Sequence, residues 1–165
     1  MVLTTHAVAG AAVASLMPNH PVLGFVAGFG SHFLLDAIPH SEYSLASVKL
    51  DPKDKMNNDM IINKKFFYDI LKIAIDVILG ITVCLLVWRP TEPYIFSAIL
   101  WGAIGGITPD ALQFVYWKLR CEPFTSIQHF HHWVHSKRDL DNDPTIGAFI
   151  QILLIFGIIL IFKIL

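Results

Sequence analysis

Charged side chains are scarce in this sequence, and their scarcity excludes most soluble folds. Only 15% of the 165 residues are charged, whereas an ordinary soluble domain carries about 25%. Hydrophobic residues make up 55% of the chain and are gathered into runs that a soluble fold of this size could not bury. The net charge is −1 with histidine neutral, so no overall positive field predicts nucleic-acid binding. We therefore expect a single integral membrane domain covering residues 1–165.

Cysteine is equally rare, which restricts the kinds of metal site that the chain can build. Cys84 lies in an apolar run and Cys121 in a polar stretch, so we expect no disulfide between them. Any metal site must then use histidines and carboxylates. The N-terminus also lacks the basic region of a secretory signal, and His6 interrupts its first apolar stretch, so we expect this segment to be retained.

Five apolar segments predict an all-α, polytopic membrane helical bundle. A helix that crosses the hydrocarbon core needs about 20 residues. The last three segments are long enough, whereas the first two are short and are either short spans or a re-entrant hairpin. The pairs Gly24/Gly28 and Gly102/Gly106 have a spacing that permits close helix packing, although small residues are common in membrane helices. The segments cover about residues 2–17, 22–38, 70–88, 94–116 and 146–165.

Two polar loops, at about residues 41–69 and 117–144, carry most of the basic residues. The first loop holds five lysines, and the second holds two lysines and two arginines. Both loops and the N-terminus lie on one side, whether the first two segments cross or form a hairpin. The positive-inside rule places that side in the cytoplasm.

Seven of the eight histidines fall at this predicted cytoplasmic end, together with the most deeply placed carboxylates. His32 and Asp36 are four residues apart and share one helix face. A buried ionisable group in a membrane helix costs about 2.5–3.5 kcal/mol, so such groups persist when they are paired or bind a ligand. Imidazole and carboxylate are typical ligands of zinc and related divalent ions. The predicted metal ligands are His6, His32, Asp36, His40, Asp110, His131, His132 and His135.

Most of these residues also have a purely structural interpretation. His32 and Asp36 could form a hydrogen-bonded pair within the membrane. His6 and His40 could be polar groups at helix ends, and Asp110 could cap its own turn.

The histidine-rich segment at 129–135 leaves the choice of ligands open. A spacing of four favours His131 and His135, with His132 close behind, and the remaining side chains would lie at the surface. His20 lies at the opposite end of the predicted bundle, in a turn, and is not expected to bind a metal.

Two further roles are predicted for charged residues near these ligands. Asp36 or Asp76 could act as a general base or could orient a ligand histidine. Lys137 and Arg138 could hold a substrate phosphate, or they could simply anchor the cytoplasmic side.

Together these features resemble the LexA-regulated, inner-membrane, metal-dependent hydrolase family. The likeness rests on the Thr5-His6 start, the glycine-rich helix into His32-x-x-x-Asp36, the Gly-x-x-Pro-Asp element ending at Asp110, and the segment around His135. A remoter similarity is to zinc-dependent phospholipases C, although here a histidine follows Asp36 by only four residues, and the order of elements differs from the commoner form of the membrane family. The resemblance implies a prokaryotic inner-membrane hydrolase of phosphoesters or lipid head groups that uses divalent ions.

The expected function is metal-dependent hydrolysis of a phosphoester or phospholipid-type substrate at the cytoplasmic interface. One to three divalent ions, zinc by preference, would serve as cofactor, and membrane lipid is the expected partner. The alternatives are a non-enzymatic metal-binding protein and a metal or proton transporter. A transporter needs polar groups at every depth of the membrane, whereas the half opposite the histidines is almost entirely apolar.

Overall fold

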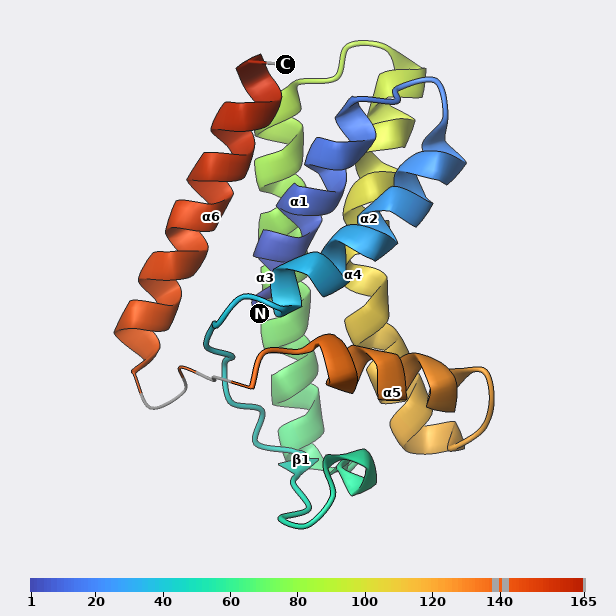
Figure 1. Cartoon of the computed structure of the whole chain (residues 1–165), viewed down its shortest axis with the longest axis vertical. Helices are drawn as coiled ribbons and strands as arrows, with labels where there is room; N and C mark the ends of the chain where they lie inside the picture. Colours follow the sequence, from blue (N-terminus) through green and yellow to red (C-terminus); the bar gives the residue numbers. More distant parts are fainter. Residues whose placement is uncertain (138–139, 141–142, 165) are drawn as a thin grey trace.

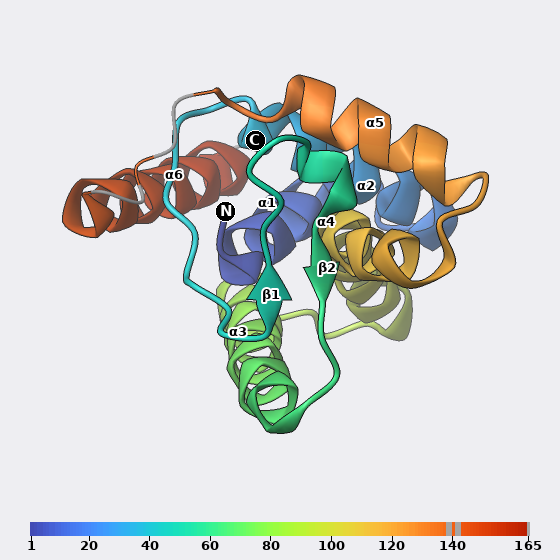
Figure 2. The same ribbon diagram turned by 90° about the horizontal axis from the view of Figure 1, so that it is seen from below.

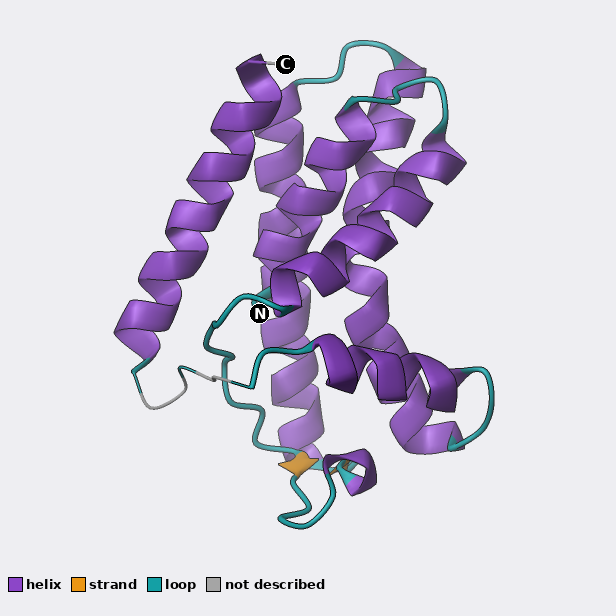
Figure 3. Ribbon diagram, viewed as in Figure 1, coloured by secondary structure: helices purple, strands orange, loops and turns teal. Residues whose placement is uncertain are grey.

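The computed structural model describes residues 1–137, 140 and 143–164, and its architecture is a bundle of helices with one small polar appendage (Figures 1 and 3). The all-α prediction is confirmed. The helices are α1 (Leu3–Ser15), α2 (Pro21–Asp36), α3 (Lys64–Trp88), α4 (Pro93–Leu119), α5 (Phe124–Val134) and α6 (Pro144–Ile164). The appendage holds strands β1 (Val48–Lys49) and β2 (Asp59–Met60) and the 3₁₀-helix η1 (Lys55–Asn57).

Helix α1 forms the centre of the bundle and packs against α2, α3, α4 and α6 (Figure 1). It is built largely from alanine, glycine and valine, which lets four neighbours approach it closely. Ala7, Val8 and Ala11 are fully buried and form the core with Ile99 and Ala103 of α4. At 13 residues, α1 is too short to cross a bilayer by itself.

The predicted close packing at small residues is confirmed. A Cβ atom on Gly28 would lie 2.3 Å from the carbonyl oxygen of Gly102, and one on Gly106 would lie 2.2 Å from that of His6. A Cβ on Gly24 would lie 3.0 Å from the Cβ of Ala14. The backbones of α1, α2 and α4 therefore meet at distances that only glycine permits.

The prediction of five membrane-embedded helices is confirmed only in part. Three helices, α3, α4 and α6, are long and apolar enough to span a membrane. Helix α2 has 16 residues and pairs with α1 as a hairpin, whose turn lies at the same end as the α3–α4 connection (Figure 1). Its outer face is apolar, with Val22 75% exposed and Val26 59% exposed.

The helix boundaries differ from those predicted at both polar loops. Helix α3 begins at Lys64 rather than near residue 70, because the Asn63 side chain accepts hydrogen bonds from the N–H groups of Lys65 and Phe66. Helix α4 continues to Leu119, and α5 occupies much of the predicted loop at 117–144. Both polar regions lie at the same end of the bundle, as expected (Figures 1 and 2).

The appendage is fixed to the bundle by polar contacts with α3 and α4. Asp69 of α3 is fully buried and accepts hydrogen bonds from the N–H and hydroxyl of Ser47, at 2.7 and 2.6 Å. Lys118 of α4 donates to Asp59 at 2.6 Å, and Arg120 donates to the Asn58 carbonyl, also at 2.6 Å. The appendage thus holds a defined position below the bundle, where Figure 2 shows it passing beneath α1.

Candidate metal centre

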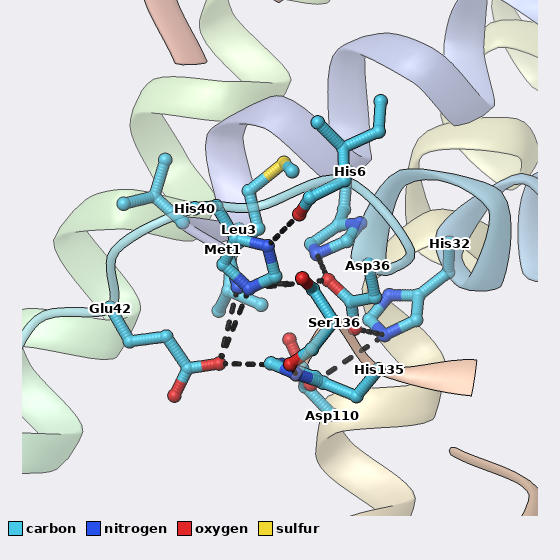
Figure 4. A network of polar contacts seen from close by, with 12 residues as sticks. Met1, Leu3, His6, His32, Asp36, His40, Glu42, Asp110, His135 and Ser136 are labelled. Carbon is cyan, nitrogen blue, oxygen red and sulfur yellow. Dashed lines mark hydrogen bonds and ion pairs between the residues drawn. The ribbon is translucent and has the colours of Figure 1, made fainter. Parts of the chain in front are cut away.

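The last two turns of α2 place His32 and Asp36 against α1 and α4 at the polar end of the bundle (Figure 4). Both side chains are buried, with exposures of 0% and 1%. His32 Nδ1 lies 2.8 Å from the carbonyl oxygen of Gly106 and donates its N–H to it. This bond fixes the ring and leaves Nε2 directed at Asp36, the arrangement in which a histidine binds a metal.

Asp36 is the hub of the cluster, because its two oxygens face different sets of histidines. Oδ2 lies 3.0 Å from Nε2 of His32 and 2.9 Å from Nε2 of His131. Oδ1 lies 3.2 Å from Nε2 of His6 and 3.7 Å from Nε2 of His40. One carboxylate is therefore shared between two groups of imidazoles.

The first group of possible ligands consists of His32, Asp36, Asp110 and His131, whose ligand atoms all lie within 4.8 Å of one another. Asp110 Oδ1 is 3.7 Å from Nε2 of His32 and 3.9 Å from that of His131. The two imidazole nitrogens are 3.2 Å apart. Ligands of a tetrahedral ion at about 2.0–2.2 Å are spaced roughly 3.3–3.6 Å apart. The distances in this group run from 2.9 to 3.9 Å and bracket that spacing, so small shifts of the side chains would let the group hold a small divalent cation.

The second group consists of Asp36, His40 and His135, again within 4.8 Å. His40 Nδ1 donates to the Ile38 carbonyl at 2.7 Å, which directs its Nε2 into the cluster. Glu42 joins this group from the solvent side, with its Oε1 3.1 Å from His135 Nε2. Packing raises the pKa of Glu42, but hydrogen bonds from His135 and His40 lower it more, so its pKa lies well below its usual range.

Several buried polar atoms in this cluster lack an aligned hydrogen bond among the described residues. They are both ring nitrogens of His6, Oδ1 of Asp36, Nε2 of His40 and Nδ1 of His131. The His6 and His32 rings are stacked with centroids 3.8 Å apart. An unsatisfied buried polar group costs about 1–3 kcal/mol. A cation would remove that cost for Oδ1 of Asp36, for Nε2 of His40 and for one ring nitrogen of His6. The donor set therefore fits one or more divalent ions.

Asp76, predicted as a general base or a partner of a ligand, instead caps the start of α1. Its carboxylate accepts hydrogen bonds from the N–H groups of Leu3 and Thr4 at 2.7 and 3.1 Å, and from the Thr4 hydroxyl at 2.6 Å. The free N–H groups of a helix N-terminus attract a carboxylate, which explains this position. Asp76 belongs to neither ligand group and acts by holding the helix that carries His6.

The remaining predicted site residues either lie at the surface or fall outside the residues that the structure describes. His132 is exposed on α5, and burial together with the nearby Lys55 lowers its pKa. Lys137 is exposed as well, and its role at a substrate phosphate stays a prediction. Arg138 lies outside the described residues. His20 is exposed in the α1–α2 turn at the far end, as expected.

Sequence reasoning missed Glu42 as a member of the cluster. It lies two residues after His40, in a segment that has no helical periodicity, so only its acidic character and proximity to His40 could have indicated it. Its carboxylate meets His135, which lies 93 residues further along the chain.

The half of the bundle beyond the cluster is apolar. Its buried side chains include Val8, Ala11, Cys84, Ile99 and Ala103. The buried polar residues found in the described chain lie towards the other end, around the cluster and the appendage. This arrangement suits a site that is reached from one end, and it lacks the continuous polar path of a transporter.

Comparisons with protein-family models, with curated proteins and with solved structures find no match to this chain. The resemblance to the LexA-regulated hydrolases therefore stays a prediction.

Proposed function

We propose that this protein is a membrane-embedded, metal-dependent hydrolase that cleaves a phosphoester or phospholipid-type substrate. The observation that carries the proposal is the shared Asp36 carboxylate, with one oxygen facing His32 and His131 and the other facing His6 and His40. Paired ions about 3.5–4 Å apart are typical of phosphoesterases, and a bridging carboxylate is a ligand that holds two ions at such a distance.

Each group would contribute its own ligands to the pair. His32, His131 and Asp110 would hold one ion, and His40 and His135 the other, with Asp36 common to both. A bound divalent ion lowers the pKa of a coordinated water from about 15.7 towards 7 and stabilises charge on a leaving oxygen. Zinc suits this set of imidazole and carboxylate donors.

The partly exposed carboxylates are the candidates for proton transfer. Asp110 is 29% exposed and Glu42 is 55% exposed, whereas Asp36 is 1% exposed. In hydrolysis, water adds at phosphorus, the ester P–O bond breaks, and the leaving alkoxide takes up a proton. Asp110 is the better candidate to accept the proton of the attacking water, because hydrogen bonds from His135 and His40 hold the pKa of Glu42 well below its usual range.

We place this site at the cytoplasmic face of a prokaryotic inner membrane. The support is the gathering of both lysine-rich polar regions at the end of the bundle that holds the cluster (Figure 1). Cys121 supplies a native reporter, since it is exposed beside this end whereas Cys84 is buried. A membrane-impermeant maleimide should label Cys121 in inverted inner-membrane vesicles and leave it unlabelled in intact spheroplasts; the reverse pattern would place the site outside.

Metal analysis and a substrate screen test the function together. The full chain, purified without chelator, should contain close to two equivalents of a transition metal and should cleave phosphomono- or phosphodiesters when loaded with zinc or manganese. Asp36→Asn should lose both properties. A protein that binds no stoichiometric metal, and whose thermal unfolding is unchanged by a chelator, would refute the proposal.

Two other outcomes would point to the alternative functions. Stoichiometric metal without hydrolysis, and with unfolding in chelator, would indicate that the ions serve only to tie α5 to the bundle. Metal flux into liposomes that depends on His32 would indicate transport, which the apolar far half of the bundle disfavours.

A further inference from the structure

A cavity of about 330 Å³ lies between α3 and α4, directly beside the metal centre. Most of its wall is apolar and comes from these two helices, with Leu45 and Met60 of the polar appendage contributing at one side. Its volume is within the range of about 300–1,000 Å³ found for small-molecule sites. The helical part of the wall includes Ile70, Ile73, Val77, Ile107, Phe114 and Trp117.

The cavity and the metal centre share two carboxylates. Asp110 and Glu42 both line the cavity. Asp110 Oδ1 is also 3.7 Å from His32 Nε2, and Glu42 Oε1 is 3.1 Å from His135 Nε2. A molecule in the cavity therefore has apolar walls along its length and the ligand cluster at one end.

The outer surface of α3 at this level is suited to hydrocarbon. Leu71, Ile75 and Ile78 are 57%, 58% and 64% exposed, and they alternate along the helix with residues that line the cavity. Helix α3 is one of the three helices long and apolar enough to span a membrane. The cavity thus lies one helix wall away from the expected lipid.

We propose that this cavity binds the single apolar chain, acyl or isoprenoid, of an amphiphilic phosphoester whose head group is held at the metal centre. The inference rests on the proposed function and names its substrate class. Asp36, Glu42 and Asp110 place negative charge at this end, and only the Met1 ammonium, 3.3 Å from Glu42 and 3.7 Å from Asp36, offsets it among the described residues outside the histidines. Divalent ions that neutralise the carboxylates would therefore favour the approach of an anionic head group. A water-soluble phosphoester without an apolar chain would make no contact with the apolar walls of the cavity.

Photolabelling tests the chain site without requiring activity. The probe is hexadecyl phosphate with a diazirine at the chain terminus, irradiated with the zinc-loaded full-length protein in lipid nanodiscs. Crosslinks should map to the cavity-lining turns at 70–77 of α3 and 107–117 of α4. Val77→Trp, which fills the cavity, should reduce them at least fivefold, whereas Ile78→Trp on the outer face of the same helix should not.

The variants must be matched for fold, so both should keep the wild-type thermal midpoint and metal content. If Val77→Trp fails to fold, Val77→Phe takes its place, because it fills less of the cavity and should still reduce the crosslinks. Crosslinks confined to the outer faces of the helices, or reduced equally by both variants, would overturn the proposal.

A chain-length series separates this inference from the proposed function. Among ethyl, butyl and octyl phosphates, KM should fall by roughly two- to fourfold for each methylene that is buried. Val77→Trp should flatten this dependence, whereas Ile78→Trp on the outer face should preserve it. Hydrolysis of all three esters with equal KM would overturn the chain site alone. Labelling of the cavity without any hydrolysis would uphold the chain site while refuting the enzymatic function.

Discussion

At one end of α1 the buried side chains include the polar Thr4, Thr5 and His6, whereas at the other end they are Ala11, Ala12 and Ala14. The first end meets carboxylates and imidazoles from three other elements, and its geometry depends on charge and hydrogen-bond direction. Glycine backbones meet both ends, for example at the His6 carbonyl and at Ala14, and at the second end the absence of side-chain volume is what sets the geometry. A single short helix is therefore held by two kinds of interaction, and substitutions at its two ends should have separable effects.

Replacing the shared carboxylate should have the largest effect on function. Asp36→Asn keeps the shape of the side chain but removes the charge that faces four histidines. Even the loss of an outer partner of a metal ligand costs about 10–100-fold in affinity, so we expect metal affinity and phosphoesterase activity to fall at least about 100-fold. Metal content by mass spectrometry and steady-state rates check this.

The matched control for that substitution is Glu122→Gln, an exposed carboxylate in the loop between α4 and α5. It should retain full metal content and activity. Retention of both by Asp36→Asn would show that the polar end does not depend on a shared ligand.

Adding one methyl group near the other end should reduce stability while leaving metal chemistry intact. The Cβ of Gly102→Ala would lie 2.4 Å from the Cβ of Ala14 and 2.5 Å from the Gly10 carbonyl oxygen. Overpacking of this kind costs about 1–3 kcal/mol. Unfolding in mixed micelles measures the loss, and metal per folded molecule should stay at the wild-type value.

Gly30→Ala is the control for Gly102→Ala, because a Cβ at Gly30 meets nothing within 4 Å. It should be neutral or should stabilise the protein by up to about 1 kcal/mol through helix propensity. Equal destabilisation by both changes would contradict the view that close backbone contact organises the apolar end.

Removing the cap of α1 should have an intermediate effect and tests how the polar end is held. Asp76→Ala deletes the acceptor of the Leu3 and Thr4 N–H groups and should cost about 1–2 kcal/mol. Metal stoichiometry of the folded fraction should persist, because Asp76 is not a ligand. Thr82→Ala, exposed on the same helix, should change stability by less than about 0.5 kcal/mol. If Asp76→Ala lost its metal without losing stability, Asp76 would be a member of the metal site.

The smallest effect is expected at His132, although it adjoins a proposed ligand. His132 is exposed, whereas His131 is buried with its Nε2 2.9 Å from Asp36. His132→Ala should leave activity and metal content unchanged, and the free energy of unfolding should change by less than about 0.5 kcal/mol. His131→Ala should lower metal content. Similar losses in the two variants would show that histidine number, rather than burial, decides binding.

Much of the fold could be predicted from local patterns, and the exceptions have identifiable causes. Apolar runs located the helices, since their lengths follow from hydrocarbon thickness. The runs did not locate the start of α3, because the Asn63 cap extends that helix into polar sequence. They also did not predict α5, which is a short helix rich in polar residues. The runs left open whether the first two segments cross the membrane or form a hairpin, because apolar composition alone does not distinguish a central buried helix such as α1 from one that faces lipid.

The candidate site was predicted less completely than the fold. The spacing of His32 and Asp36 indicated a shared face, and the spacing of His131 and His135 favoured the two histidines that join the ligand groups. The contact of Asp76 with the start of α1 was not predicted, because nothing in its neighbourhood along the chain indicates it. Glu42 was overlooked for the same reason, since its contact with His135 is a tertiary one.

The sequence by itself determined that this chain forms apolar helices and that its histidines and deep carboxylates gather at one end. Both properties follow from composition and from periodicity along the chain. Only the tertiary structure decided which oxygen of Asp36 faces which imidazole, which carboxylate caps α1, and where an apolar cavity adjoins the cluster. These depend on contacts between residues as many as 99 positions apart, as between His32 and His131, and such contacts are set by how closely the glycine faces of the helices pack.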